Sequence, residues 1–255
     1  MLKMKIGLRA GHSDNCLGAI GIVNEHEQMK KYYEVVKGIL EQYGHTVIDC
    51  NSNGSTPNAE LSEGVNKANS NNADLFVSLH MNCFNGQANG TETLVSSKSS
   101  RAYPYAEKLV NNFAELGFLN RGVKCERLFE MNHCKAPNII SEICFCDSKK
   151  DIDIYNKYSW EQLAYVFCNA VDGNIPKNVE FKSKGYVVTN YLPNGVIGDN
   201  SFIGVDLEYV LSYFKDVKCY VRGNDKGIWI ETQVLPINKC LELKEILGNW
   251  FYEIK

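Results

Sequence analysis

The stretch of sequence that decides the fold lies near the N-terminus and reads Met4-Lys5-Ile6-Gly7-Leu8-Arg9-Ala10-Gly11-His12. Apolar residues occupy every second position from 4 to 8, which is the period of a half-buried strand, and the run breaks at Gly11. His12 therefore follows the C-terminal end of a predicted strand. Ligands bind at that edge of an open α/β sheet, because loops there can vary without disturbing the core. On position alone, packing or exposure to solvent explains such a histidine as well as function does.

Predicted strands and helices alternate along the chain as far as residue 173. The later predicted strands are 46–48, 74–80, 90–96 and 137–145, and the predicted helices are 25–43, 59–68, 102–116, 148–158 and 160–171. The strand at 74–80 is almost continuously apolar, which is typical of the centre of a sheet, and it also ends on a histidine. This alternation predicts an α/β fold for residues 1–173, a three-layer domain with a mostly parallel central sheet.

A change of composition marks the end of this domain. Residues 174–184 contain Pro176 and several lysines with little periodicity, which predicts a linker. Beyond it, strands are predicted at 186–192, 218–222, 228–234 and 249–254, with helices at 205–214 and 238–247 and a hairpin turn at 223–227. Residues 185–255 are thus expected to form a small α+β domain in the order βαββαβ.

The overall composition is that of an ordinary globular protein. Of 255 residues, 44% are hydrophobic and 22% charged, which suits one large domain or, as we favour, two smaller ones. The net charge of −3 predicts no general attraction to nucleic acid or to acidic lipid. No apolar run is long enough to span a membrane, and we expect no secretory signal peptide, hence synthesis in the cytoplasm. The ten cysteines lie inside predicted strands and helices, and we expect them to be reduced and mostly buried.

Three potential metal ligands fall at comparable ends of the predicted sheet. His12 follows the first strand, Glu25 begins the first helix after Asn24, and His80 ends the strand at 74–80. Two imidazole nitrogens and one carboxylate oxygen suit zinc, and three protein ligands leave a fourth position open, as in catalytic rather than structural sites. Glu142 interrupts an otherwise apolar strand. Because burying an unpaired carboxylate is costly, Glu142 either meets a cation or serves as an acid/base with a raised pKa.

Structural roles explain both carboxylates as well. A glutamate in the first turn of a helix offsets the macrodipole, so Glu25 has a role without any metal, and Glu27 competes for the ligand position. An ion pair with Arg9 or Arg121 is the alternative for Glu142.

Three further histidines are candidates for other arrangements. His26 and His45 are expected to face solvent, and His133 is expected in a loop. The spacing contains no compact zinc signature that would choose among these arrangements.

Several short motifs carry a resemblance to a known family. They are Gly11-His12, Gly18-Ala19-Ile20-Gly21, Asn24-Glu25, Leu79-His80-Met81-Asn82 and Ser141-Glu142-Ile143-Cys144-Phe145-Cys146-Asp147. In this order they resemble the zinc-dependent N-acetylmuramoyl-L-alanine amidases of the Amidase_3 type, particularly clostridial phage endolysins, over roughly residues 3–172. The resemblance implies His12, Glu25 and His80 as zinc ligands and Glu142 as the catalytic acid/base. Many members have Gly-His-Gly-Gly where this chain has Gly11-His12-Ser13-Asp14, but the ligand itself is not displaced.

The resemblance also implies a function. A peptidoglycan hydrolase of this kind cleaves the amide bond between N-acetylmuramic acid and L-alanine with zinc-activated water, and an endolysin reaches the cell wall from the host cytoplasm after release. The alternatives are a zinc peptidase acting on the stem peptide and a non-enzymatic wall-binding protein. Residues 185–255 weakly resemble the SPOR type of peptidoglycan-binding domain through element order alone. Their aromatic residues suit binding to the wall, although a core role or a homodimer contact explains them too.

Overall fold

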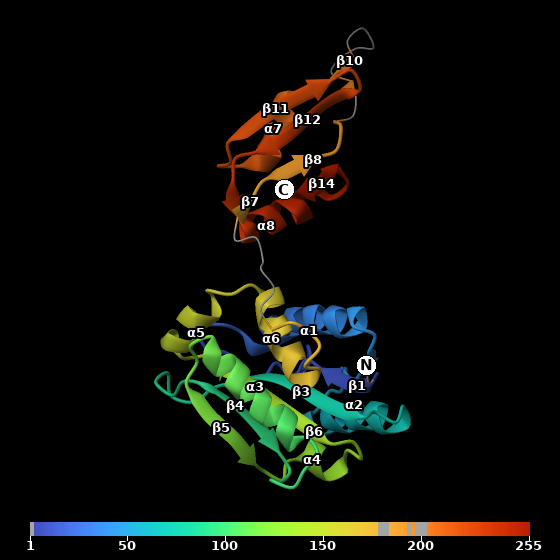
Figure 1. The fold of residues 1–255 in the computed structure, drawn as a ribbon, viewed down its shortest axis with the longest axis vertical. Coiled ribbons are helices and arrows are strands. Elements are labelled where there is room, and N and C mark those ends of the chain that lie inside the picture. Colours follow the sequence, from blue (N-terminus) through green and yellow to red (C-terminus); the bar gives the residue numbers. More distant parts are fainter. Residues whose placement is uncertain (1–2, 178–183, 193–194, 197–202) are drawn as a thin grey trace. The chain divides into compact units, whose positions relative to one another are not determined.

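The chain forms two compact units, residues 1–179 and 180–255. The computed structural model describes residues 3–177, 184–192, 195–196 and 203–255 (Figure 1). Most of the predicted linker, residues 178–183, lies outside the described residues. Among the helices that are described, none combines the length and the apolar character needed to cross a membrane.

The first unit is built on a six-stranded sheet with the order β2-β1-β3-β6-β4-β5. Its strands are β1 Lys5–Arg9, β2 Thr46–Asp49, β3 Leu75–Asn82, β4 Thr91–Val95, β5 Asn120–Cys125 and β6 Asn138–Phe145. Every neighbouring pair is parallel except β4 and β6. The predicted fold class is therefore confirmed, and the apolar strand β3 lies inside the sheet between β1 and β6.

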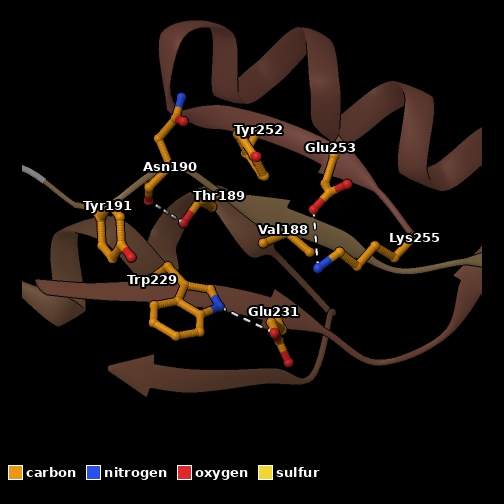
Figure 2. Close-up of a pocket in the computed structure, with 9 residues that line it drawn as sticks. All are labelled: Val188, Thr189, Asn190, Tyr191, Trp229, Glu231, Tyr252, Glu253 and Lys255. Carbon is orange, nitrogen blue, oxygen red and sulfur yellow. Dashed lines mark hydrogen bonds and ion pairs between the residues drawn. The ribbon is translucent and has the colours of Figure 1, made fainter. Parts of the chain in front are cut away.

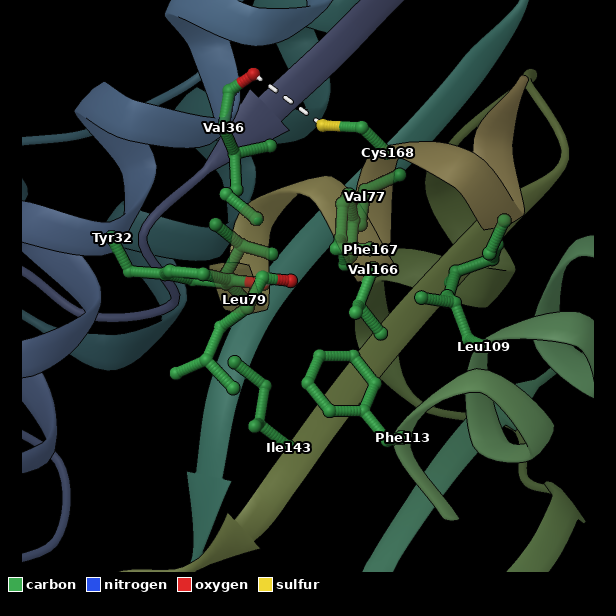
Figure 3. Close-up of a cluster of buried hydrophobic side chains, with 14 of the residues drawn as sticks. Tyr32, Val36, Val77, Leu79, Leu109, Phe113, Ile143, Val166, Phe167 and Cys168 are labelled. Carbon is green, nitrogen blue, oxygen red and sulfur yellow. Dashed lines mark hydrogen bonds between the residues drawn. The ribbon is translucent and has the colours of Figure 1, made fainter. Parts of the chain in front are cut away.

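Helices cover both faces of this sheet. The helices are α1 Glu25–Gln42, α2 Pro57–Ser70, α3 Tyr103–Glu115, α4 Phe129–His133, α5 Lys149–Tyr155 and α6 Trp160–Val171. Side chains from α1, α3 and α6 form the main hydrophobic core with alternate residues of the strands, such as Val77 and Leu79 of β3 (Figure 3). Phe76 points to the opposite face, where it packs with Cys50 and with Ala68 of α2.

The period-two alternation of the strands decides where the polar side chains go. In β3, Ser78 and His80 share the face of Phe76, away from the main core. In β6, Ile139 and Ile143 belong to the main core, so Glu142 lies on that same second face. The sheet therefore brings the polar residues of neighbouring strands together near its C-terminal edge.

The second unit holds the predicted βαββαβ order. Its main elements are β8 Val187–Thr189, α7 Leu207–Leu211, β11 Cys219–Asn224, β12 Gly227–Thr232, α8 Ile237–Leu247 and β14 Phe251–Ile254. The strands form an antiparallel sheet in the order β11-β12-β8-β14. Two short pairs join β7 Lys184–Gly185 to β13 Leu235–Pro236 and β9 Gly195–Val196 to β10 Ile203–Gly204, and 3-10 turns follow α7 and α8.

All ten cysteines are unpaired, as expected for reduced thiols. Five of them are buried, whereas Cys83 and Cys125 are exposed, so the expectation that most are buried holds for only half.

Candidate functional site

His12, Glu25 and His80 come together at the C-terminal edge of the first sheet. His12 lies just beyond β1, Glu25 is the first residue of α1, and His80 lies two residues before the C-terminal end of β3. Glu25 Oε2 lies 3.4 Å from His12 Nε2, and Glu25 Oε1 lies 3.0 Å from His80 Nδ1. One potential ligand atom from each residue lies within 4.8 Å of the others. The two imidazole rings meet edge to face with centroids 4.8 Å apart. One nitrogen of each ring, Nε2 of His12 and Nδ1 of His80, lies close to the Glu25 carboxylate.

The start of α1 fixes the position of Glu25. The Asn24 side chain caps the helix by accepting a hydrogen bond from the Glu27 amide, which makes Glu25 the first helical residue. The amides of Ala19 and Met81 donate to its two carboxylate oxygens at 2.8 and 3.0 Å. Glu25 is buried and held from three sides, whereas Glu27 is exposed on the helix surface. Of the two glutamates, only Glu25 belongs to the cluster.

Electrostatics keep Glu25 ionised. Burial alone would raise the pKa of this carboxyl, but its interactions with His12 and His80 outweigh burial and hold the pKa well below its usual range. For His80, burial disfavours the charged ring, yet the Glu25 contact and the nearby Glu142 charge outweigh it and raise the pKa. A carboxylate oxygen and an imidazole nitrogen 3.0 Å apart require a positive centre between them, either a proton or a metal ion.

Gly11 and Gly18 have no side chain, and this makes room for the two histidine rings. Gly11 has a φ of +76°, and a Cβ there would lie 2.9 Å from the His80 ring. Gly18 has a φ of +69°, and its Cβ would lie 2.4 Å from His12 and 2.6 Å from Glu25. Both backbone conformations favour glycine, and both positions tolerate no side chain without moving a potential ligand.

Glu142 lies beside this cluster. In the parallel register of β3 and β6 it is the partner of His80, and its Oε2 atom is buried with no hydrogen-bond partner among the residues that the structure describes. Burial raises the pKa of Glu142 to about 7. A carboxyl group with that pKa can hold or release a proton near neutrality.

The ion pairs considered for Glu142 do not form. Arg9 pairs with Glu60 and Glu130, and Arg121 pairs with Glu92. The alternative explanation of Glu142 as a partner of Arg9 or Arg121 is therefore wrong.

A buried polar network behind His80 was not predicted from the sequence. Ser78 Oγ lies 3.3 Å from His80 Nε2 and donates to Glu130 Oε1 at 3.3 Å. Arg9 donates to the same Glu130 oxygen at 2.6 Å and to Glu60 at 2.5 Å. All of these residues except His80 are fully buried. Arg9 sits at a polar position of an alternating strand, which was the one signal available, but its partners come from α2 and α4 far along the chain.

The remaining histidines lie elsewhere, and two of them differ from expectation. His26 and His45 were expected to face solvent but are buried, and each contacts a carboxylate: His26 contacts Asp14 at 2.8 Å and His45 contacts Asp172 at 3.2 Å. His133 is the last residue of the short helix α4 rather than part of a loop, and it is exposed. None of the three joins the cluster at Glu25.

Fold and site together define a class, an α/β protein with a candidate metal centre of two histidines and one glutamate at the edge of a mostly parallel sheet. Residues 6–173 match the family model described as N-acetylmuramoyl-L-alanine amidase, Amidase_3. The chain belongs to this family.

Relatives and solved structures agree with that assignment. An uncharacterised 38.4 kDa protein of Clostridium perfringens is 37% identical over 183 residues, which are 69% of this chain and 53% of that protein. The amidase LytC of Bacillus subtilis is 30% identical over 148 residues, 55% of this chain and 29% of LytC. The catalytic domain of the CD27L endolysin, which targets Clostridia Difficile, is 33% identical with a TM-score of 0.62, covering 69% of this chain and 99% of that domain. The chain spans about half the length of the first curated relatives that it matches.

Proposed function

We propose that this protein is a peptidoglycan hydrolase that cleaves the amide bond between N-acetylmuramic acid and L-alanine. The proposal assigns His12, Glu25 and His80 as zinc ligands and Glu142 as the catalytic acid/base. The observation that carries it is the strand register that places Glu142 beside His80. A carboxyl group whose buried Oε2 atom has no hydrogen-bond partner among the described residues thus lies next to a cluster of potential ligands. Membership of the amidase family supports the reaction class.

The donor set fits zinc. Two imidazole nitrogens and one ionised carboxylate oxygen are a borderline-soft combination, and three protein ligands leave room for a further group. Gly11 and Gly18 keep the space around these donors free of side chains. When bound, zinc supplies a Lewis acid that polarises the substrate carbonyl and activates water for attack.

The residues of the chain then handle the proton. Glu142 as carboxylate accepts a proton from the attacking water, and as carboxylic acid it delivers that proton to the amine of L-alanine as the amide bond breaks. A pKa of about 7 lets one group perform both steps at neutral pH. Glu25 stays ionised throughout, because its carboxylate is held by two amides and two imidazoles.

The wider assignment is that of an endolysin, made in the cytoplasm and acting on the wall after release. The CD27L endolysin domain supports this reading of the first unit. Residues 185–255 would then hold the enzyme on its insoluble substrate, which raises its local concentration there. A homodimer formed through these residues is the competing proposal for the same unit.

The decisive experiment measures metal content together with lysis of purified walls before and after chelation. We expect about one zinc per chain and lysis that stops with chelator and returns with zinc. Product analysis then separates the amidase, which frees the lactyl carboxyl of muramic acid, from a zinc peptidase, which frees an amino-acid carboxyl. A folded protein without zinc whose lysis ignores the chelator, or one with no lysis at all, would refute the proposal.

A further inference from the structure

The antiparallel sheet of the second unit has one covered and one open face. On β12, Ile228 and Ile230 point inward and join the hydrophobic core beneath α7 and α8, whereas Trp229 and Glu231 alternate with them on the other face. Cross-strand partners share a face, so Tyr220 of β11, which pairs with Glu231, lies on the open face too.

Aromatic residues are concentrated on this open face. Tyr191 and Tyr252 are 49% and 62% exposed, and Tyr220 is 38% exposed. The solvent face of a one-sided antiparallel sheet is ordinarily polar. Exposed aromatic rings gathered on one face therefore indicate a surface with a binding role.

Tyr191, Trp229 and Tyr252 line a hollow of about 300 Å³, whereas Tyr220 is not part of its lining (Figure 2). Its lining comes from three strands, with Val188 at its base, Trp229 and Glu231 from β12, and Tyr252 and Glu253 from β14. That volume lies at the lower end of the range for small-molecule sites and suits one or two sugar rings.

The aromatic part of the hollow is held in place before any ligand arrives. Tyr191 meets Trp229 edge to face, with ring centroids 5.8 Å apart at 89°. Asn224 donates to the Tyr191 hydroxyl at 3.0 Å, and the Trp229 indole donates to Glu231 at 3.1 Å. Rings fixed in this way lose little freedom on binding, which favours affinity.

Charge selects among the possible occupants. Glu231 is paired with Arg222 at 3.0 Å, and Glu253 is paired with Lys255 at 3.1 Å. Arg222 beside the hollow and Lys255 in its lining are thus each paired with a carboxylate, and Lys218 lies over the Tyr220 ring, which is not part of the lining. The hollow itself therefore offers no excess positive charge to a phosphate-rich polymer. A pyranose ring matches it better, because such a ring has an apolar face for aromatic contact and a rim of hydroxyls that donate to carboxylates.

We propose that the hollow lined by Tyr191, Trp229, Glu231 and Tyr252 binds an uncharged sugar ring of the cell-wall polymer. The ring packs against the aromatic side chains and donates hydroxyl hydrogen bonds to Glu231 and Glu253. This inference rests on the proposed function, since it names the wall component that the second unit holds.

The test uses the full chain with chelator present, so that retention on walls is measured without hydrolysis. Purified walls from a panel of clostridia and bacilli are incubated with the wild type and with Trp229→Ala, Tyr252→Ser and Tyr209→Ser, and bound protein is sedimented. Tyr209 is the matched control, because it is an exposed tyrosine of α7 that meets Tyr213 edge to face outside the hollow. We expect Trp229→Ala and Tyr252→Ser to weaken retention at least about tenfold and Tyr209→Ser to leave it unchanged.

Competition identifies the ligand. The neutral polysaccharide fraction released from a retaining wall should displace the wild type, and the anionic polymer fraction should not. Equal retention of all variants, no retention on any wall, or displacement by the anionic fraction alone would overturn the inference. So would a change of oligomeric state in Tyr252→Ser with unchanged retention, which would make the face a contact between copies.

Tyr252 is largely exposed, so its replacement keeps the test valid if Trp229→Ala fails to fold. Zinc content and release of muramic lactyl carboxyl are measured separately, so failure here is distinguishable from failure of the proposed function.

Discussion

Ser78 Oγ lies 3.3 Å from His80 Nε2, on the edge of the imidazole opposite the Nδ1 atom that faces Glu25 at 3.0 Å. A histidine that offers Nδ1 to a metal carries its proton on Nε2, and that proton needs an acceptor. Ser78 is placed to accept it while donating its own hydroxyl to Glu130. With Nδ1 of His80 turned to a metal ion, as we propose, the serine would hold the ring in that tautomer and orientation.

Replacing Ser78 by alanine should therefore weaken zinc binding. Residues that hold a metal-ligating histidine typically contribute ten- to hundredfold to affinity, and we expect a loss of about tenfold, measured by competition with a chromogenic chelator. The control is Ser159→Ala, which removes the N-cap of α6 and lowers stability by about 1 kcal/mol without touching the site. Unchanged zinc affinity in Ser78→Ala would show that the serine does not orient His80.

Arg9 forms ion pairs with two buried glutamates, so its removal should be costly. In Arg9→Met, Glu60 and Glu130 lose their cationic partner in a buried setting, and the free energy of unfolding should fall by about 3–5 kcal/mol in urea titration at pH 7. Arg121→Met is the comparison, because the Arg121–Glu92 pair is partly exposed and should contribute less than about 1 kcal/mol. Similar losses in both variants would contradict the importance of burial.

Glu142→Gln should separate metal binding from catalysis. The amide keeps the shape of the side chain but accepts no proton, so lysis should fall by about 10²- to 10⁴-fold while zinc content stays near the wild-type value. His80→Ala should lose both, because it removes a proposed ligand. Near-normal turnover in Glu142→Gln would refute the assignment of the acid/base.

The parts of the fold that were predicted correctly are those with strong periodicity. β3 and β6 are long apolar strands, and α1 and α6 show helical spacing with clear caps. Two elements of the first unit were not predicted, and neither were the short strands β7, β9, β10 and β13 of the second. Strand β5 lies at the edge of the sheet and is half-exposed, so it lacks apolar alternation, and α4 is a helix of five residues, too short to show a period.

The candidate site likewise contains residues that the sequence predicted and residues that it did not. The sequence located His12 and His80 because each follows an apolar strand, and the structure brings them to Glu25, although their role as ligands stays a proposal. Glu60 and Glu130 could not be found, since their burial depends on reaching Arg9 from 51 and 121 residues away. His26 and His45 were misjudged for the same reason, because tertiary partners rather than local pattern bury them.

Gly18 offers a test of the space around the proposed ligands. In Gly18→Ala the new Cβ would collide with His12 and Glu25 at a positive φ, so zinc affinity should fall at least about tenfold in the same chelator assay. Gly38→Ala is the matched control in the exposed interior of α1, where a Cβ meets nothing within 4 Å. That change should leave zinc binding intact and raise stability by about 0.5–1 kcal/mol. Wild-type affinity in Gly18→Ala would mean that His12 can move without cost to the site.

Asp147 holds the loop that follows β3. Its Oδ2 atom accepts hydrogen bonds from the amides of Phe84 and Gly86 at 3.1 and 2.8 Å. Burial alone would raise the pKa of this carboxyl, but these amides outweigh it and hold the pKa below the ordinary value of 3.8. Because its pKa is depressed in the folded state, Asp147 stabilises the fold at pH values above its pKa in the unfolded chain. This contribution disappears as the pH falls through the pKa of the folded state.

Asp147→Asn should therefore lower stability at pH 7 by about 1.5 kcal/mol, the contribution of hydrogen bonds to a charged acceptor. The difference in the free energy of unfolding between wild type and variant should be constant above about pH 5. It should disappear below about pH 4, because only the wild-type side chain titrates there. Hydrogen exchange of the Phe84 and Gly86 amides should accelerate in the variant at neutral pH. Asp153→Asn, which breaks an exposed pair with Lys149 on α5, should cost less than about 0.5 kcal/mol and leave those amides unchanged. A gap that stays constant down to pH 3 would show that the charge of Asp147 does not hold the loop.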